Sequence, residues 1–572
     1  MKRTETLAAL RERPDIAVLI VGGGINGISV FRELALQGVD VLLAEKGDYC
    51  SGASAALSRM VHGGLRYLEN GEFKLVKESL RERDRLLRNA PHYVAPLPTM
   101  VPIFDIFSGI ANGAVRFLGL TRRPSRRGAL VIKAGLTLYD VFTASRRLMP
   151  THRFRGRKET LKAWPAINPA TRSSATYYDA WVSRPERLGL EMLNDAMAAS
   201  RAARALNYAR IGSDEDGLAL TDTVSGETLR LRPRLVINAT GGWIDLTNKA
   251  IGAPALRMMG GTKGSHLIVD NQELHDALGA NMVYYENEDG RICILFPYLG
   301  KVLIGSTEIR VDDPDTVRCE DDELQYILQS LAFVFPSIKI AKHEIVFRFS
   351  GVRPLPASKD SFTGRIPRDH FCEFVEPVGN LPATLCMIGG KWTTFRSFGA
   401  LAADMALERS GLVRTVGTED LAIGGGRDFP SDPADWCARL AAEHGLTMPR
   451  AQTLLERYGT SAGAIAAANS VVPDPMLPGT DYSTGEIRLI IEREHVESLA
   501  DIFLRRTTIA IAGDLTCQLV DAVLSILAIC KGWSTAQADT ERTAFLSLLE
   551  HQHGVLLPNL PGENNKRSAI CA

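Results

Sequence analysis

The chain has 572 residues and a formal net charge of zero, because 66 lysine and arginine residues balance 66 aspartate and glutamate residues. With 45% hydrophobic and 23% charged residues, its composition is that of an ordinary globular protein. A neutral chain has no overall field that attracts nucleic acid, so no nucleic-acid partner is expected and an anionic ligand needs a local group of cations. The length predicts three or four structural units, or fewer if one is a large nucleotide-binding domain.

The cysteines give no sign of a disulfide framework or of structural zinc. The nine of them are odd in number and contain no Cys-x-x-Cys pair, which predicts free thiols in a reducing, cytoplasmic compartment. The charged first twelve residues do not resemble a secretion signal, and the most apolar stretch, 507–530, contains acidic residues. No bilayer-spanning segment is therefore expected. His551 and His553 are assigned to a solvated tail, and no metal site is predicted.

The first structural signal along the chain is a β-α-β unit. Residues 16–21 form a short apolar run rich in β-branched side chains, which is typical of a buried parallel strand. A Gly-x-Gly-x-x-Gly segment follows at 22–27, then helical apolar spacing to residue 37 and a second buried-strand pattern at 39–44. In this context the glycine segment predicts dinucleotide binding.

Four residues of this unit have predicted roles in holding the dinucleotide. Gly22 makes the tight turn, Gly24 lets the backbone approach a pyrophosphate at the helix N-terminus, and Gly27 permits close packing of the helix on the strand. Glu45, which ends the second strand pattern, is predicted to accept hydrogen bonds from ribose hydroxyls. A carboxylate here, where NADP-binding proteins use arginine, argues against a 2′-phosphate.

The distribution of buried strands favours FAD over NAD. A nicotinamide dehydrogenase usually places its substrate domain after one continuous nucleotide domain, whereas this chain returns to buried strands at 235–239 and 385–388, each followed by glycine. A discontinuous nucleotide domain with antiparallel insertions is typical of FAD proteins, and the polar loop 50–58 is predicted to contact the flavin side. The further residues predicted to bind the cofactor are Ser54, Ser58, Gly241, Gly390 and Thr394.

The rest of the pattern predicts two more domains. Alternating runs at 218–231 around Ser225-Gly226 predict a hairpin. Strand patterns at 266–269, 291–296 and 302–304, with a helix at 320–335, predict an antiparallel sheet, and the spacing beyond residue 426 is helical, at 434–444, 449–458 and 484–505. The predicted domains are FAD-binding (14–75, 205–260 and 350–420), substrate-binding (76–204 and 261–349) and helical (421–545), followed by a tail (546–572).

Four segments place a cation or an imidazole beside glycine at an apparent loop or strand end. They are His62-Gly-Gly-Leu-Arg66-Tyr67, Gly261-Thr-Lys263-Gly-Ser-His266, Ser350-Gly-Val-Arg353 and Gly389-Gly-Lys391-Trp-Thr-Thr394. Arginine offers a planar fork to phosphate oxygens and lysine a compact charge. Each cation alone is more often an ordinary surface residue. Together, and with a dinucleotide segment, they predict a site for a phosphate-bearing substrate.

The runs 22–27, 58–69, 263–266, 350–355 and 389–396 together resemble the FAD-dependent glycerol-3-phosphate dehydrogenase family. The resemblance extends from about Ile16 to Arg506. It implies an α/β and α+β fold: a glutathione-reductase-like, FAD-binding Rossmann domain with an inserted antiparallel-sheet substrate domain, and an all-α C-terminal domain that contributes to homodimers. Members of this aerobic, quinone-linked family oxidise sn-glycerol 3-phosphate to dihydroxyacetone phosphate, as peripheral proteins on the inner face of the cytoplasmic membrane.

The resemblance also implies the substrate residues, which are Arg66, Tyr67, Lys263, His266, Arg353 and Lys391. Hydride is expected to pass from carbon 2 of the substrate to flavin N5 while the hydroxyl proton leaves. Arginine is effectively never neutral, so Arg353 suits stabilisation of the developing alkoxide, and an imidazole suits proton abstraction. We expect His266, in preference to His62, to be this base, and Arg66 and Lys391 to hold the phosphate.

The sequence leaves alternatives open for the substrate and for the type of reaction. After Trp181-Val182 the segment 183–187 replaces an acidic stretch of the family, which puts the identity of the polyol in doubt. One alternative is the same chemistry on a longer phosphorylated polyol such as erythritol phosphate. A second is a flavin amine or amino-acid oxidase, which makes peroxide and needs no phosphate site. A third is a binding or sensing module whose flavin no substrate reduces.

Overall fold

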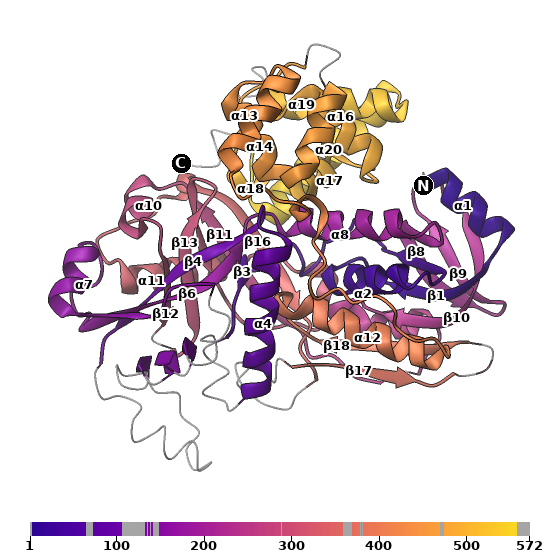
Figure 1. Cartoon of the computed structure of the whole chain (residues 1–572), viewed down its shortest axis with the longest axis horizontal. Helices are drawn as coiled ribbons and strands as arrows, with labels where there is room; N and C mark the ends of the chain where they lie inside the picture. The colour runs from indigo at the N-terminus through magenta and orange to yellow at the C-terminus, as the bar shows by residue number, and fades with distance from the viewer. Residues whose placement is uncertain are drawn as a thin grey trace, which may run out of the picture.

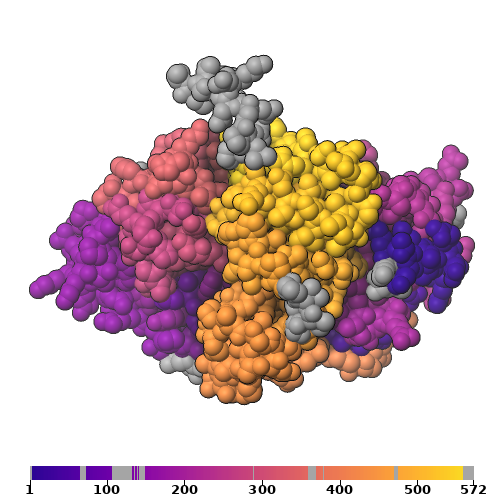
Figure 2. Space-filling view, turned by 90° about the horizontal axis from the view of Figure 1, so that it is seen from above, coloured from indigo at the N-terminus to yellow at the C-terminus, as the bar shows by residue number. Residues whose placement is uncertain are grey.

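The computed structural model describes residues 3–64, 72–105, 132–133, 135–137, 139–140, 148–254, 256–287, 289–357, 369–377, 379, 381–469 and 474–557. These residues form two large sheets with their covering helices and a helical domain that lies over both (Figure 1). The view from above shows the helical domain, in orange and yellow, between the two sheet-containing parts (Figure 2).

The first sheet is a mainly parallel Rossmann sheet in the order β17-β18-β10-β1-β2-β7. Its strands are β1 (Asp15–Val21), β2 (Val41–Ala44), β7 (Ala203–Leu206), β10 (Thr228–Asn238), β17 (His370–Val375) and β18 (Ala383–Gly389). Val21 lies beside both Ala44 and Asn238, so three parallel strands end together at one edge of the sheet. The hairpin predicted at 218–231 is confirmed, because β9 (Gly217–Asp222) pairs antiparallel with β10, and β8 (Ala209–Asp214) extends it.

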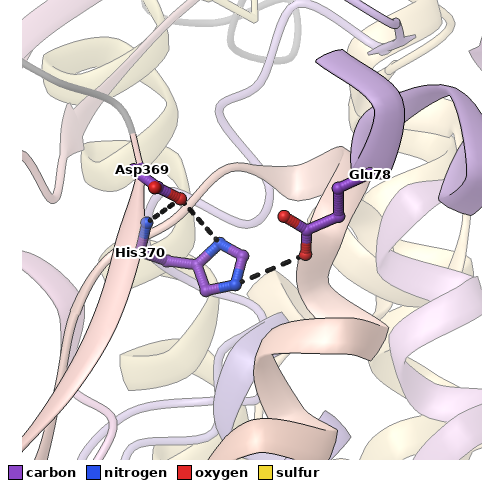
Figure 3. A group of neighbouring side chains, drawn as sticks. All are labelled: Glu78, Asp369 and His370. Carbon is purple, nitrogen blue, oxygen red and sulfur yellow. Dashed lines mark hydrogen bonds and ion pairs between the residues drawn. The ribbon is translucent and has the colours of Figure 1, made fainter. Parts of the chain in front are cut away.

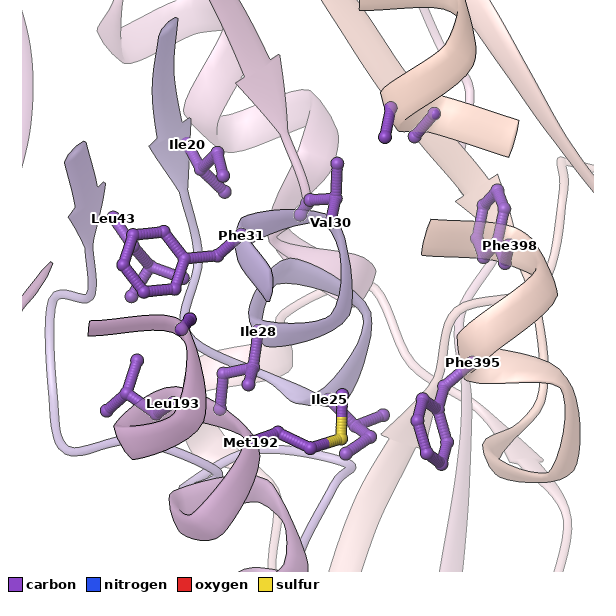
Figure 4. Close-up of a cluster of buried hydrophobic side chains, with 14 of the residues drawn as sticks. Ile20, Ile25, Ile28, Val30, Phe31, Leu43, Met192, Leu193, Phe395 and Phe398 are labelled. Atoms are coloured by element: carbon purple, nitrogen blue, oxygen red, sulfur yellow. The ribbon is translucent and has the colours of Figure 1, made fainter. Parts of the chain in front are cut away.

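Helix α2, opened by the glycine segment, packs between two helices from distant parts of the chain. These helices are α2 (Ile25–Leu36), α8 (Pro185–Ala199) and α12 (Phe395–Arg409), and α1 (Arg3–Glu12) and α9 (Ile244–Ala250) flank the same sheet. Figure 4 shows Ile28 of α2 close to Met192 of α8, and Ile25 of α2 between Met192 and Phe395 of α12. Because α8 turns apolar side chains to α2, α8 and β7 belong with the first sheet. The segment predicted for the substrate domain therefore ends before α8 and not at residue 204.

The second sheet confirms the predicted inserted, mainly antiparallel sheet. Its order is β15-β11-β14-β13-β12-β4-β6-β3, with β16 beside β11 and β5 beside β6. The strands are β3 (Met60–Val61), β4 (Val94–Ile103), β5 (Arg153–Gly156), β6 (Ser173–Val182), β11 (Thr262–Val269), β12 (Met282–Glu286), β13 (Ile292–Tyr298), β14 (Lys301–Gly305), β15 (Ile309–Arg310) and β16 (Ile345–Arg353). The accompanying helices are α4 (Phe73–Asn89), α7 (Arg157–Ala163), α10 (Gln272–Leu278) and α11 (Asp321–Val334).

The helical domain is confirmed and extends further than predicted. Its helices are α13 (Pro433–His444), α14 (Met448–Tyr458), α15 (Ala462–Asn469), α16 (Thr484–Arg493), α17 (Leu499–Asp501), η9 (Ile502–Arg506), α18 (Ile509–Ala512), α19 (Cys517–Lys531), α20 (Thr535–Leu548) and η10 (Leu549–His553). The helix predicted over 484–505 is broken between α16 and α17. His551 is exposed, as predicted, but residues 546–557 are not a free tail, because Leu549 is fully buried and the His553 ring stacks on Phe347 at 4.4 Å.

No helix in the described ranges combines the length and the apolar character needed to cross a membrane.

Candidate functional site

The edge where β1, β2 and β10 end together opens into a cavity of about 690 Å³, the dinucleotide cavity. Five residues predicted to bind the cofactor line it, namely Gly22, Gly24, Glu45, Ser54 and Gly241. They come from three segments, the last of which follows the other two by almost two hundred residues, and the parallel strand register brings them to one place. This position, at the carboxyl ends of parallel strands, is where doubly wound folds bind nucleotides.

The glycine segment is shaped by close approaches of its backbone. Gly22 has φ +109°, a conformation that side chains other than glycine rarely adopt. A Cβ on Gly27 would lie 1.9 Å from the carbonyl oxygen of Gly22, so only glycine allows α2 to pack this closely on the turn. Gly27 thus lies behind the cavity wall, where the sequence predicted a packing role for it.

The N-terminus of α2 and two polar side chains form the polar wall of the dinucleotide cavity. Ser54 Oγ accepts from the backbone N–H of Ile25 at 2.9 Å, and Glu45 accepts from the N–H groups of Gly23 at 2.6 Å and Gly47 at 2.9 Å. Burial raises the pKa of Glu45, although both N–H groups act to lower it.

One acceptor in this wall has no partner. The buried Oδ1 of Asn26, which lines the dinucleotide cavity, accepts no hydrogen bond from the described part of the chain. A helix N-terminus is suited to a diphosphate, and Asn26 to a donor on the same ligand. The residues present therefore fit a dinucleotide cofactor.

A second, smaller cavity of about 230 Å³, the inner cavity, adjoins the first one. Ile25, Asn26, Ala53, Ser54 and Pro354 line both cavities. The predicted residues that the structure brings together around the inner cavity are Ser54, Ser58, His62, His266, Arg353, Gly390 and Lys391. All four of the segments in which a cation or imidazole lies beside glycine contribute to this set.

Two glycines of the second sheet make room for the charged and imidazole groups. A Cβ on Gly264 of β11 would lie 2.2 Å from Nη2 of Arg353, and a Cβ on Gly305 of β14 would lie 2.1 Å from the His266 ring. The guanidinium of Arg353 donates to the carbonyl of Thr307 at 3.2 Å. These close contacts fix the two side chains at the cavity wall. The roles of Gly264 and Gly305 could not be predicted from the sequence, because they depend on which strands pair.

His266 is held in a neutral form. Its Nε2 lies 2.7 Å from Ser58 Oγ, its ring stacks on Phe349 at 5.0 Å, and it is 1% exposed. Burial, and then the charges of Arg353 and Arg59, lower the pKa of His266 to about 3. Arg59, which is buried and ion-paired with Glu186, is a contributor that sequence analysis missed.

Lys263 does not reach the inner cavity, contrary to the prediction. Side chains alternate along a strand, so Gly264 and His266 face the cavity while Lys263 faces α11. There its Nζ lies 2.6 Å from Glu323 Oε2 and donates to the carbonyl of Arg318 at 3.0 Å. Its role in this structure is to neutralise a buried carboxylate.

Three other predicted residues are not seen at the cavities. Thr394 is fully buried and lines neither of the two, and its hydroxyl donates to the carbonyl of Lys391 at 3.3 Å. Arg66 and Tyr67 lie outside the described residues. Trp392 also lines the inner cavity, although the sequence predicted no role for it.

The imidazole of His370, at the start of β17, lies between the carboxylates of Glu78 and Asp369 (Figure 3). Glu78 Oε1 is 3.5 Å from Nε2 of His370, and Asp369 Oδ1 is 4.0 Å from its Nδ1. The three groups are close enough to hold a metal ion, but the carboxylates face different ring nitrogens. Burial lowers the pKa of His370, and Lys391 lowers it further while both carboxylates act to raise it. We assign no metal to this group.

Two family models match the chain. One is described as FAD dependent oxidoreductase and matches residues 17–396, and the other, described as the C-terminal domain of alpha-glycerophosphate oxidase, matches residues 416–538. The first match spans both sheets and both cavities, and the second spans most of the helical domain.

Named relatives match over nearly the whole chain. A glycerol-3-phosphate dehydrogenase of Synechocystis sp. is 33% identical over 565 residues, covering 93% of this chain and 96% of the relative. A D-erythritol 1-phosphate dehydrogenase of Brucella abortus is 31% identical over 507 residues, covering 86% and 93%. The crystal structure of a glycerol-3-phosphate dehydrogenase from Bacillus halodurans, complexed with FAD, has the same fold, with a TM-score of 0.72, 21% identity and coverage of 96% and 97%.

Proposed function

Because this chain belongs to the FAD-dependent glycerol-3-phosphate dehydrogenase family, we propose that it oxidises the secondary alcohol of sn-glycerol 3-phosphate to dihydroxyacetone phosphate. Its cofactor is FAD, and the glycine segment, Glu45 and the N-terminus of α2 would hold the dinucleotide part. Bound FAD would supply a hydride acceptor at flavin N5. The observation that carries the proposal is the inner cavity, which adjoins the dinucleotide cavity and gathers Arg353, Lys391 and two imidazoles.

Arg353 would stabilise the negative charge that develops on the oxygen at carbon 2. Its guanidinium stays charged at any ordinary pH. It is fixed at the cavity wall by the carbonyl of Thr307 and by Ser306 Oγ, at 3.2 and 3.1 Å. A donor held in place before the reaction stabilises a developing oxyanion without reorganising.

His62, and not His266, is the proton acceptor that we propose. His266 is almost fully buried, its Nε2 is engaged by Ser58, and its pKa of about 3 makes it a weak base. His62 is half-buried at the cavity wall, where its backbone N–H donates to Thr393 Oγ1 at 3.2 Å. The stacked, neutral His266 would instead shape the cavity around the substrate.

Lys391 would bind the phosphate, with Arg66 and Tyr67 as its proposed companions. Lys391 follows the strand β18 and lines the inner cavity. Binding of a remote phosphate orients carbon 2 for reaction, so the phosphate contributes to the rate as well as to affinity.

A dye-linked assay of Lys391→Met tests this assignment. The variant is expected to lower kcat/KM for sn-glycerol 3-phosphate roughly 10- to 100-fold, the effect of losing one charge-assisted contact. It should leave the slow oxidation of unphosphorylated glycerol nearly unchanged. Lys301→Met is the control, because Lys301 pairs with Asp270 outside both cavities and should change neither rate.

The same assay separates the alternatives. The panel includes D-erythritol phosphates, since a relative named for that substrate is 31% identical. A higher kcat/KM for an erythritol phosphate than for sn-glycerol 3-phosphate would reject the proposed substrate. Peroxide formation from amino acids, unaffected by Lys391→Met, would indicate an oxidase of a different class.

The electron acceptor that we propose is a membrane quinone, reached through peripheral contact with the inner face of the cytoplasmic membrane. The support for the acceptor, for this location and for a homodimer is the sequence resemblance alone. Oxidation of the substrate-reduced protein by a short-chain quinone in the presence of lipid vesicles would test the acceptor directly.

A further inference from the structure

The loop 45–54 forms one wall of the dinucleotide cavity. Glu45 and Gly47 near its start, and Ser51 and Ser54 near its end, line that cavity. Asp48, in the middle of the loop, is 2% exposed and is bonded to the helical domain instead. The loop therefore joins the cofactor site to a part of the protein that is remote in sequence.

Both carboxylate oxygens of Asp48 accept hydrogen bonds from arginines of the helical domain. Nε of Arg505 and Nη1 of Arg506 donate to Oδ2, and Nη2 of Arg506 donates to Oδ1 at 2.9 Å. Nδ2 of Asn207 also donates to Oδ1, at 2.9 Å. We call Asp48, Arg505 and Arg506 the Asp48 clamp. The side chains of Asp48 and Arg506 are 0% exposed, so salt does not screen their contact.

The charge on Asp48 depends on the two arginines. Burial opposes ionisation of the carboxyl, but the charges of Arg506 and Arg505 outweigh it and hold the pKa of Asp48 well below its usual range. Removing either partner of such a buried pair leaves the other charge uncompensated and also frees the segment that the pair had anchored. The segment that carries Asp48 is the loop 45–54.

The helical-domain side of the clamp is itself anchored. Arg505 Nη2 donates to Asp501 Oδ1 at 2.7 Å, and Arg506 Nη2 donates to the carbonyl of Glu494 at 2.7 Å. Both arginines end the short helix η9, which follows α17 directly. Their guanidinium groups therefore present a fixed target to the carboxylate.

Backbone hydrogen bonds of the loop connect Asp48 to the groups predicted to bind the cofactor. The carbonyl of Asp48 accepts from the N–H of Ser51 at 3.2 Å, and the N–H of Cys50 donates to the carbonyl of Gly23 at 2.9 Å. Gly23 in turn donates to Glu45. A shift of Asp48 would therefore displace both Ser51 and the glycine segment.

We propose that the helical domain controls the retention of FAD through the Asp48 clamp. Asp48, Arg505 and Arg506 are positioning residues, since they act through Glu45, Ser51 and Ser54 and do not line the cavity themselves. This inference concerns the cofactor and is independent of which substrate the enzyme oxidises.

A second buried ion pair provides a matched control. Nη1 of Arg187, on α8, donates to both oxygens of Glu494, at 2.7 and 2.6 Å, and the two side chains are 7% and 10% exposed. This pair also joins the first-sheet part to the helical domain, but neither residue belongs to the loop 45–54. It therefore reports on domain docking without the loop.

The test compares FAD release from purified holoenzyme of Asp48→Asn and of Glu494→Gln, two carboxylate-to-amide changes. Each protein is diluted into an excess of an apoflavoprotein that traps free FAD, and the loss of bound flavin is followed with time. Asp48→Asn is expected to release FAD at least about tenfold faster than the wild type. Glu494→Gln is expected to release FAD at the wild-type rate, even if its melting temperature falls as much as that of Asp48→Asn.

Release from Asp48→Asn at the wild-type rate would overturn the proposal. Equally faster FAD release from both variants would overturn the proposal as well, because the Asp48 clamp would then act only through the docking of the helical domain. If Asp48→Asn fails to fold, Arg506→Lys is tested in its place, because it keeps the positive charge but loses the planar guanidinium that bonds both carboxylate oxygens. Faster release than from Glu494→Gln supports the clamp, and wild-type release contradicts it.

Discussion

The two imidazoles at the inner cavity differ in burial, since His62 is half-buried and His266 is almost fully buried. His266 is stacked, almost fully buried and near two guanidinium groups, which together with burial lower its pKa to about 3. A general base must be neutral to accept a proton, so its activity falls as the pH drops through its pKa. His266 remains neutral far below the pH at which histidines usually titrate, so it produces no loss of activity near neutral pH.

His62→Asn is therefore expected to lower kcat for sn-glycerol 3-phosphate by roughly 10²- to 10⁴-fold, the usual contribution of a general base. It should also abolish the fall of kcat/KM on the acid side of the pH profile. His266→Asn should reduce kcat less and leave that acid limb in place. The opposite pattern in the two pH profiles would show that His266 is the base.

Strand β11 presents two chemically different faces. Gly264 and His266 face the inner cavity, and Lys263 and Ser265 face the buried carboxylate of Glu323, which Ser265 Oγ contacts at 2.8 Å. Thr307 Oγ1 donates to the same carboxylate at 2.6 Å, and the carbonyl of Thr307 accepts from Arg353. The face of β11 that carries Lys263 and Ser265 thus supports the face that lines the inner cavity.

Lys263→Met is expected to destabilise the protein without changing its preference for a phosphorylated substrate. Loss of the lysine leaves Glu323 buried without its cation, at a cost of about 3 to 5 kcal/mol in the free energy of unfolding. Urea denaturation measures this loss, and adding Glu323→Gln should recover part of it. If the ratio of kcat/KM for sn-glycerol 3-phosphate to that for glycerol fell as in Lys391→Met, Lys263 would be a substrate residue after all.

Local patterns were enough to predict the β-α-β unit and the hairpin, and most of the predicted site residues lie at one of the two cavities. Each of those depends on residues that are close in sequence, or on strands that end in glycine. The face on which Lys263 lies depends on the pairing of β11 with β16, and a shift of one residue would reverse it. The burial of His553 depends on packing against Phe347 of β16, and no local pattern encodes that contact.

At the scale of the whole molecule, several buried ion pairs connect separate parts of the chain. The Asp48 clamp connects the cofactor loop to the helical domain, and His553 at the end of that domain stacks on β16, the strand that carries Arg353. The helical domain therefore contacts elements of both cavities. It is part of the site's support, and its apolar core is continuous with that of the second sheet.

The central claim is that carbon 2 of sn-glycerol 3-phosphate reduces the flavin of this protein. Anaerobic stopped-flow mixing of the purified holoenzyme with sn-glycerol 3-phosphate measures it, by following flavin absorbance with substrate carrying hydrogen or deuterium at carbon 2. We predict that the absorbance is lost within the turnover time and that deuterium slows the loss. An absorbance unchanged by sn-glycerol 3-phosphate, or bleached at the same rate by both isotopic forms, would contradict the account.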